Sequence, residues 1–497
     1  MLFNSVDFLF FFPIVAFIYF LIPHKIKWIW LLFASYYFYM SWNPKYALLM
    51  GLSTVVTYLS GLLISWTRKQ AGRLTHTKIK VLCKTWVFLS FFLNLSVLFF
   101  YKYFAFAISN INAALSTFGI STLDISFSLI LPVGISFYTF QALSYTADVY
   151  SGDIEAEKNL GKYALFVSFF PQLVAGPIER SENLLTQISD THRFDYNNAK
   201  YGLQLMLWGL FQKLAIADRL SPIVDNVYNN YDQSTGIQII FATMLFAIQI
   251  YCDFAGYSNI AIGASQVMGF NLIQNFDTPY FATSIKDFWK RWHISLSTWF
   301  RDYLYIPLGG NRCSTVRKYA NLMITFLVSG LWHGASWNYV IWGGLHGAYQ
   351  IIGEILKPAR QKCIRLLNID TESFSHKFLQ RCITFTLVCI AWVFFRAPSA
   401  TKAFDIISQA ARNINILSIR TDIQSLGIGT IEVLAILCLL MVSLANSHAF
   451  SVRKFIERQD TWFRWLLYWI ETVVVCYYFI LQNGGFQGAV QFIYFQF

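Results

Sequence analysis

The sequence has few charged residues, and this shortage excludes a large class of proteins. Only 13% of the 497 residues are Asp, Glu, Lys or Arg, whereas 56% are hydrophobic and 19% are aromatic. Soluble globular domains carry about 25% charged residues. A water-soluble chain could not cover so much apolar surface with polar atoms. The composition therefore excludes an ordinary soluble protein and predicts that lipid surrounds much of the chain.

The sequence also lacks the motifs of several other chemistries. Its eight cysteines include no Cys-x-x-Cys pair, so neither a zinc cluster nor a disulfide framework is predicted. The pair Gly309–Gly310 lacks the spacing and the lysine of a phosphate-binding loop. There is no Gly-x-Ser-x-Gly elbow of a serine hydrolase. We expect no bound cofactor and no metal site.

Long apolar runs are what the sequence does contain. A helix needs about 20 apolar residues to cross a bilayer. Runs that contain Pro and Gly, at 131–134 and 170–177, indicate broken or re-entrant helices inside protein. The pattern predicts an all-α polytopic membrane protein, with about ten to twelve transmembrane and re-entrant helices. The runs lie at 6–22, 28–42, 46–66, 85–105, 128–148, 201–217, 238–256, 320–353, 382–397, 431–446 and 464–482.

The net charge of +12 is concentrated in short loops. Lys25 and Lys27 follow the first run, and six basic residues fill 68–84 before the fourth. Short basic loops stay in the cytoplasm. Two runs separate these loops, so both can be cytoplasmic if the N-terminus is extracytoplasmic. We therefore interpret the basic excess as a topology signal, with some contact to anionic membrane lipids, and expect no nucleic-acid partner.

Two histidines lie where chemistry could occur. Within 283–312, the helical spacing of Trp289, Trp292 or His293, Ser297 and Phe300 predicts an amphipathic interfacial helix, which the turn at 308–311 ends. His333 lies in an apolar run, where an ionisable side chain suggests a functional site. A buried neutral imidazole can accept a proton from a hydroxyl and return one to a leaving group. A hydrogen-bonded packing role is the alternative for both residues, and also for His346.

Several motifs resemble those of bacterial membrane-bound O-acyltransferases, in particular the alginate and peptidoglycan O-acetyltransferase branch. Teichoic-acid D-alanyl transferase is a more distant relative. The resemblance covers nearly the whole chain. It rests on residues 131–137, 169–178, 217–219, 249–258, 275–280 and 287–312, and on the Leu-Trp-His-Gly block at 331–334.

This resemblance implies a ring of helices around a central catalytic tunnel. It identifies His333 as the catalytic histidine, the general base, and His293 as the second active-site histidine. It implies acetyl-CoA or another acyl thioester as the cytoplasmic donor substrate. The implied acceptor is a hydroxyl of an extracytoplasmic cell-envelope polysaccharide, such as an exopolysaccharide, or an SGNH-type acyltransferase partner. We expect the donor entrance to be lined by Trp289, Trp292, Trp299 and Trp332, for which an aromatic interfacial belt is the alternative.

The final residues, 491–497, resemble a terminal tyrosine motif of envelope acylation systems, in which a phenol accepts the acyl group and passes it on. This resemblance makes Tyr494 the acyl relay. An aromatic anchor at the bilayer boundary is the alternative.

We expect residues 1–497 to form one acyltransferase domain in a bacterial cell membrane. Its predicted parts are peripheral helices at about 1–105, a catalytic core at about 128–397 and further helices at about 398–497. Two other functions stay open. One is D-alanyl transfer from a carrier protein to teichoic acid, and the other is a transporter or flippase with no covalent step, because broken helices also occur in transporters.

Overall fold

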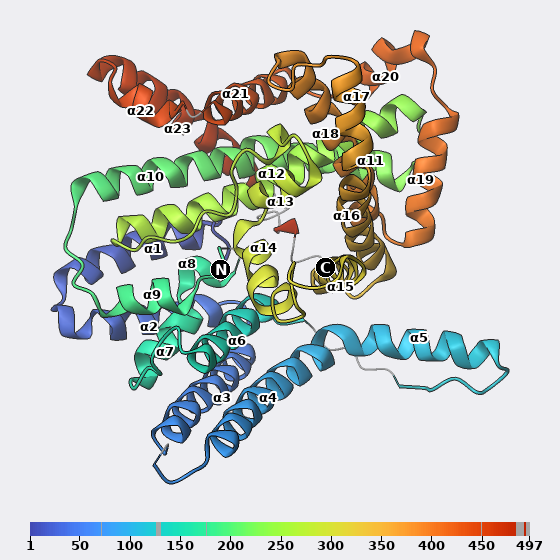
Figure 1. Cartoon of the computed structure of the whole chain (residues 1–497). Helices are drawn as coiled ribbons and strands as arrows, with labels where there is room; N and C mark the ends of the chain where they lie inside the picture. Colours follow the sequence, from blue (N-terminus) through green and yellow to red (C-terminus); the bar gives the residue numbers. More distant parts are fainter. Residues whose placement is uncertain (71, 126–130, 175, 449, 484–491, 494–497) are drawn as a thin grey trace. The chain divides into compact units, whose positions relative to one another are not determined.

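The structure is a computed structural model, and it describes all residues except 71, 126–130, 175, 449, 484–491 and 494–497. All regular elements of the described residues are helical (Figure 1), which confirms the all-α prediction. The chain divides into two compact units. Unit 1 comprises Met1–Met206 and Ile260–Ile273, and unit 2 comprises Leu207–Asn259 and Gln274–Phe497.

Unit 1 holds the N-terminal helices. They are α1 (Val6–Leu21), α2 (His24–Met40), α3 (Pro44–Lys69), α4 (His76–Leu98), the π-helix η1 (Phe99–Tyr103), α5 (Phe104–Thr117), α6 (Ile135–Ser151), α7 (Leu160–Ser168), α8 (Phe170–Leu173) and α9 (Ser181–Ser189). Two further helices, α10 (Tyr196–Leu210) and α12 (Gly236–Val267), have residues in both units.

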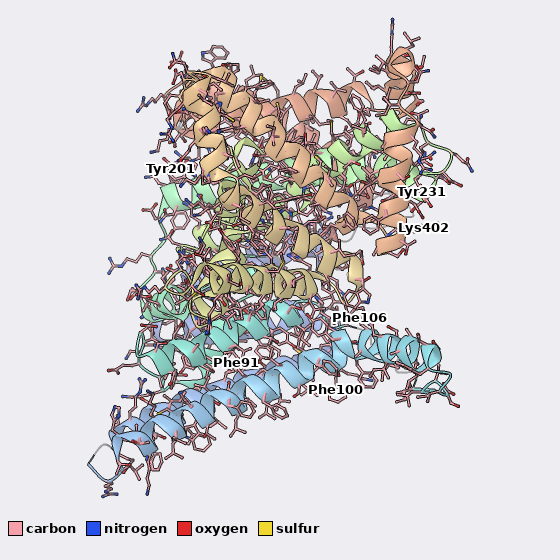
Figure 2. The ribbon with its side chains drawn as sticks, turned by 45° about the vertical axis from the view of Figure 1, so that its right-hand side comes forward. Phe91, Phe100, Phe106, Tyr201, Tyr231 and Lys402 are labelled. Carbon is pink, nitrogen blue, oxygen red and sulfur yellow. The ribbon has the colours of Figure 1, made fainter. Side chains whose placement is uncertain are left out.

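Unit 2 holds the remaining helices. They are the π-helix η2 (Phe211–Ala217), α11 (Asp218–Asn229), η3 (Pro279–Phe281), α13 (Ile285–Arg291), α14 (Ile294–Phe300), the π-helix η4 (Arg301–Tyr305), α15 (Thr315–His333), α16 (Trp337–Ile355), α17 (Lys357–Leu366), α18 (Phe374–Arg396), α19 (Ala400–Arg412), η5 (Ile416–Ser418), α20 (Ile419–Ser425), α21 (Thr430–Ser447), α22 (Val452–Glu457) and α23 (Thr461–Asn483). A hydrogen bond of 2.9 Å from Lys402 Nζ to Tyr231 Oη joins α19 to the turn that follows α11; Figure 2 labels both residues.

Six helices of the described residues are long and apolar enough to cross a membrane: Pro44–Lys69, His76–Thr117, Gly236–Val267, Phe374–Arg396, Thr430–Ser447 and Thr461–Gln482. The helix His76–Thr117 carries a row of aromatic side chains that includes Phe91, Phe100 and Phe106 (Figure 2). Phe100 is 55% exposed. An apolar surface of this kind is stable in lipid and not in water. The chain is thus a multi-pass membrane protein.

Two predicted runs are interrupted by turns. The turn at 131–134 ends at Gly134, whose φ of +74° is left-handed, and α6 begins directly after it, so the described part of the run 128–148 is helical from Ile135 onward. The run 320–353, expected as one apolar segment, is two helices, because Ser336 has an extended backbone (φ −155°, ψ 153°) between α15 and α16.

The helices α15 and α16 pack backbone to backbone. A Cβ atom on Gly343 would lie 2.2 Å from the carbonyl oxygen of Phe326 and 3.1 Å from Cα of Gly330. No side chain larger than hydrogen fits at either glycine unless the helices separate. This close contact fixes the end of α15, where His333 lies.

Gly343→Ala is therefore expected to destabilise the protein by about 1–3 kcal/mol, the usual effect of overpacking a core. Gly344→Ala is the matched control, because its added Cβ would meet only a side-chain carbon of Leu327, at 3.4 Å. Melting temperatures in detergent measure both effects. Equal melting temperatures for the two variants would contradict the tight contact.

Candidate active site

His293 lies at a break between two short helices, α13 and α14. Its φ of +44° is left-handed, a conformation that a residue with a side chain rarely adopts. Two backbone hydrogen bonds hold the break: Ile294 N donates to the carbonyl oxygen of Asn275 at 3.0 Å, and Asp277 N donates to that of Arg291 at 2.9 Å. The prediction of one continuous amphipathic helix was wrong, because these bonds remove backbone groups from the helical ladder.

Hydrogen bonds between buried side chains connect the same break to α12. Asn275 Nδ2 donates to Ser258 Oγ at 3.1 Å, and Ser295 Oγ donates to Asn275 Oδ1 at 2.6 Å. All three side chains are buried. A strained backbone persists only where its surroundings over-determine it, and such positions cluster at functional sites. The geometry thus supports a functional role for His293.

His333 is the last residue of α15 and is enclosed by aromatic rings. Its ring centroid lies 4.9 Å from that of Trp342, 5.0 Å from Trp332 and 5.5 Å from Phe395. Only 3% of its surface is exposed. Water therefore has little access to this imidazole.

The structure brings the two predicted histidines together. Their ring centroids are 6.5 Å apart, and Trp332 contacts both rings. The ring of Phe254, on α12, lies 4.6 Å from His293 and completes this side of the enclosure. His293 lies outside the candidate membrane-spanning helices, and burial lowers its pKa to about 3. At neutral pH this imidazole is therefore uncharged, and its ring N–H can donate a hydrogen bond to an oxygen atom inside the poorly hydrated enclosure.

Three of the four predicted tryptophans belong to this aromatic cluster. Trp332 contacts both histidines, and Trp292 packs in the same core at 5.1 Å from Trp392. Trp289 Nε1 donates a hydrogen bond of 3.2 Å to His346 Nδ1. The described contacts of Trp299 are with Phe300 and Tyr303, on the following turn. Whether these rings line a donor entrance stays a prediction.

The sequence did not single out every residue of the enclosure. Phe254 lies inside the 249–258 motif, yet nothing in the sequence shows that its ring reaches His293. A signal does exist for Lys213, Asp218 and Asp253, because charged residues beside or within apolar runs are rare and usually functional.

Tyr494, the predicted acyl relay, lies outside the described residues. Among the residues that the structure does describe, no group of three His, Cys, Asp or Glu side chains could hold a metal ion.

Comparison with known proteins identifies the family of the chain. The profile of MBOAT, the membrane-bound O-acyltransferase family, matches residues 36–395. The chain belongs to the membrane-bound O-acyltransferase family, and it is an O-acyltransferase. The transporter alternative accordingly loses its support.

Three relatives show which acyltransferases the chain is similar to. The chain is 40% identical over 406 residues to "Probable alginate O-acetylase AlgI" of Azotobacter vinelandii, which covers 81% of this chain and 77% of that protein. It is 35% identical over 439 residues to the peptidoglycan O-acetyltransferase of Helicobacter pylori, covering 82% and 79%. It is 28% identical over 294 residues to the teichoic acid D-alanyltransferase of Streptococcus thermophilus, covering 54% and 69%.

The buried state of His293 predicts a loss of stability in acid. Its pKa is about 3 in the folded chain and about 6.5 in the unfolded chain. Between these values the unfolded chain binds a proton that the folded chain does not. The stabilisation is therefore complete above about pH 6.5 and is lost as the pH falls, by at most about 1.4 kcal/mol per pH unit.

Melting temperatures in detergent at about pH 5 and about pH 7.5 measure this loss. His293→Gln should show a smaller acid-induced drop than the wild type. The exposed His448→Gln is the control and should show the wild-type drop. A full-sized drop in His293→Gln would mean that His293 is not held neutral in the fold.

Proposed function

We propose that this chain transfers an acetyl group from a cytoplasmic thioester, acetyl-CoA, through the membrane to a hydroxyl of an extracytoplasmic cell-envelope polysaccharide. The observation that carries the proposal is the enclosed pair of His293 and His333, with ring centroids 6.5 Å apart. The acetyl group and the polysaccharide acceptor are supported by relatives named as alginate O-acetylase and peptidoglycan O-acetyltransferase.

His333 is the general base of the proposed reaction. Its neutral imidazole takes the proton of the acceptor hydroxyl, and the oxygen attacks the thioester carbonyl. The C–O bond forms, the C–S bond breaks, and the proton passes from the imidazolium to the departing thiolate. His293 polarises the carbonyl oxygen through its ring N–H. The aromatic enclosure excludes water, which would otherwise hydrolyse the thioester.

Tyr494 is proposed as a relay between the donor and the polysaccharide. The phenol is then the acceptor hydroxyl that attacks the thioester, and it leaves as a phenolate, a better leaving group than an alkoxide, when the polysaccharide hydroxyl attacks the acetyl ester. Transfer onward can involve an SGNH-type partner outside the membrane. In this proposal the whole chain works as one domain of a bacterial cell membrane, with the N-terminus outside and the basic loops at 25–27 and 68–84 inside.

Purified protein incubated with acetyl-CoA labelled in the acetyl group tests the donor. We expect release of free coenzyme A and an acetyl adduct on the protein, read by mass spectrometry of the intact chain and of its peptides. A parallel reaction contains a D-alanyl carrier protein. Turnover of the carrier protein, with none of acetyl-CoA, would contradict the proposed donor and support D-alanyl transfer.

A further inference from the structure

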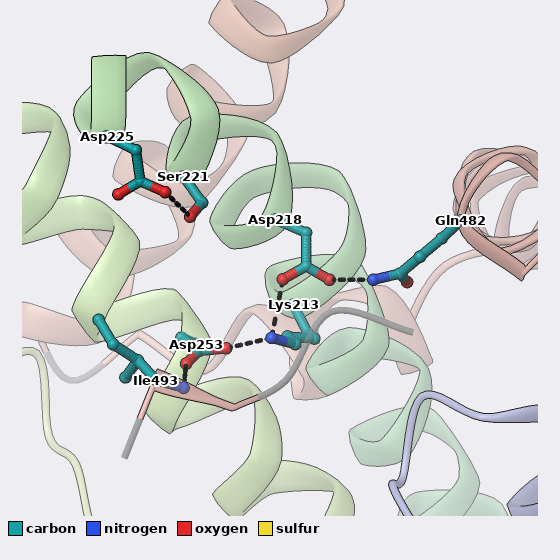
Figure 3. A network of polar contacts seen from close by, with 7 residues as sticks. All are labelled: Lys213, Asp218, Ser221, Asp225, Asp253, Gln482 and Ile493. Carbon is teal, nitrogen blue, oxygen red and sulfur yellow. Dashed lines mark hydrogen bonds and ion pairs between the residues drawn. The ribbon is translucent and has the colours of Figure 1, made fainter. Parts of the chain in front are cut away.

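A buried lysine in unit 2 is shared by two aspartates. Lys213 Nζ lies 2.7 Å from Asp218 Oδ1 and 2.5 Å from Asp253 Oδ1 (Figure 3). All three side chains are less than 10% exposed. Burial by itself would lower the pKa of Lys213, but the two carboxylates outweigh it and raise that pKa. The lysine therefore stays charged and forms an ion pair with each of the two aspartates.

The π-helical backbone places two members of this cluster on one face. Lys213 lies in the π-helix η2, and Asp218 follows it five residues later. In an α-helix two such residues would point about 140° apart. The i→i+5 register of a π-helix brings them to one face, and π-helical turns occur frequently at functional sites. A Cβ on Gly256 would lie 2.7 Å from Gly209 O and 3.2 Å from Lys213 N, so α12, which carries Asp253, touches the same backbone.

The second oxygen of each carboxylate accepts a hydrogen bond from a residue in the C-terminal part of the chain. Asp218 Oδ2 accepts a hydrogen bond of 2.9 Å from Gln482 Nε2, and Asp253 Oδ2 accepts one of 2.7 Å from Ile493 N (Figure 3). Ile493 is 6% exposed. The cluster thus binds a peptide group at a place to which water has little access.

The segment Phe492–Ile493, bound in this way, is connected to the candidate active site by contacts between aromatic rings. Phe492 is fully buried, and its ring lies 4.7 Å from that of Tyr257 and 5.7 Å from that of Phe254. Phe254 in turn contacts His293 at 4.6 Å. One continuous set of contacts therefore runs from the charged cluster to the second histidine.

We propose that Lys213, Asp218 and Asp253 form a peptide-docking clamp, which holds the segment Phe492–Ile493 against Phe254 and so positions both the segment and His293 for acyl transfer. This inference rests on the proposed function. Tyr494 follows Ile493 directly in the sequence, so the clamp fixes the point from which the proposed relay starts. Lys213, Asp218 and Asp253 are positioning residues, since they act through Phe254 and the docked segment.

Two substitutions break the clamp from opposite sides. Asp253→Asn leaves one acceptor oxygen where the carboxylate has two, so the contact with Lys213 or with Ile493 N must be lost. Ile493→Pro removes the donor N–H and leaves the charged cluster intact. Each change removes a charge-assisted hydrogen bond, and we expect acyl transfer to the acceptor to fall roughly ten- to hundredfold. The double variant should be little worse than either single one, because both remove one interaction.

Two control variants distinguish the loss of the clamp from a general loss of folding. Ile493→Val keeps the N–H group. Asp225→Asn changes a carboxylate on α11 that is 43% exposed and pairs with Arg396. Both controls should transfer at the wild-type rate. Melting temperatures are measured in parallel, because a merely structural cluster would lower the melting temperature and leave the rate per folded molecule unchanged.

A second readout does not depend on catalysis. Ile493→Cys should resist a hydrophilic maleimide in the wild-type background and become labelled at position 493 when Asp253→Asn is added. Wild-type labelling and wild-type transfer in both clamp variants would overturn the proposal. If the wild type uses neither acetyl-CoA nor a carrier protein, the proposed function fails, and the labelling still decides whether the clamp exists. If Asp253→Asn does not fold, Ile493→Pro decides.

Discussion

Replacing His333 with alanine is expected to lower the rate of acyl transfer by about 10²–10⁴-fold, the usual contribution of a general base. The acceptor hydroxyl keeps its proton at neutral pH, and an unaided hydroxyl is a poor nucleophile toward a thioester. Both coenzyme A release and acetylation of the acceptor should fall together, because one step produces both. The measurement is the labelled acetyl-CoA assay with purified protein.

The control for His333→Ala is His376→Ala. His376 is a half-buried histidine at the start of α18, which contacts Gln380 at 2.9 Å. This variant should retain wild-type activity. Removing the His333 ring also empties part of an aromatic core, so rates are compared per folded molecule, as judged by the melting transition. A folded His333→Ala protein that transfers acetyl groups at the wild-type rate would exclude His333 as the base.

Replacing Tyr494 with phenylalanine is expected to abolish acetylation of the final polysaccharide while membrane insertion stays intact. The substitution removes one oxygen atom and keeps the aromatic ring, so an interfacial anchor would survive it. A relay would not, because the oxygen is the atom that carries the acetyl group. The acetyl adduct on the terminal peptide should disappear in the same variant.

Tyr477→Phe is the control for this experiment, because Tyr477 lies on α23 and is 52% exposed. It should leave the product unchanged. Unchanged polysaccharide acetylation in Tyr494→Phe would remove the relay from the proposal and favour the anchor. The general-base role of His333 would stand in that case, since the acceptor hydroxyl could attack the thioester directly.

The sequence was sufficient for the helical class, and its motifs singled out two histidines whose catalytic role stays a prediction. Long apolar runs leave a membrane protein few choices besides helices, since every backbone group must be paired within the segment. His293 and His333 could be proposed as site residues because each lies in a dense motif. Their proximity could not be derived from periodicity, since it depends on contacts between α12, the break that separates α13 from α14, and α15.

The break at His293 shows a second limit. Residues 285–300 have the spacing of one amphipathic helix, and no Pro or Gly interrupts them. The interruption comes from Asn275, whose backbone oxygen accepts the amide of Ile294. Such tertiary hydrogen bonds override local propensity and are invisible in a local window.

The charged cluster was missed for a related reason. Lys213 and Asp218 are five residues apart, a spacing that an α-helix would place on different faces. Asp253 lies 40 residues from Lys213 along the chain. Only the wider turn of η2 and the packing of α12 bring the three side chains together.

The π-helix η2 also bears on how such a protein can change over generations. A π-turn holds one more residue than an α-turn, so the loss of a single codon within residues 211–217 would convert it to the ordinary register. A deletion between Lys213 and Asp218 would leave the two residues four positions apart, on one face of the resulting α-helix. A deletion at Phe211 or Gln212 would instead leave them five positions apart and about 140° around the helix axis from each other. The position of a one-codon deletion would therefore decide whether the charged cluster, and with it the contact to the terminal segment, survives.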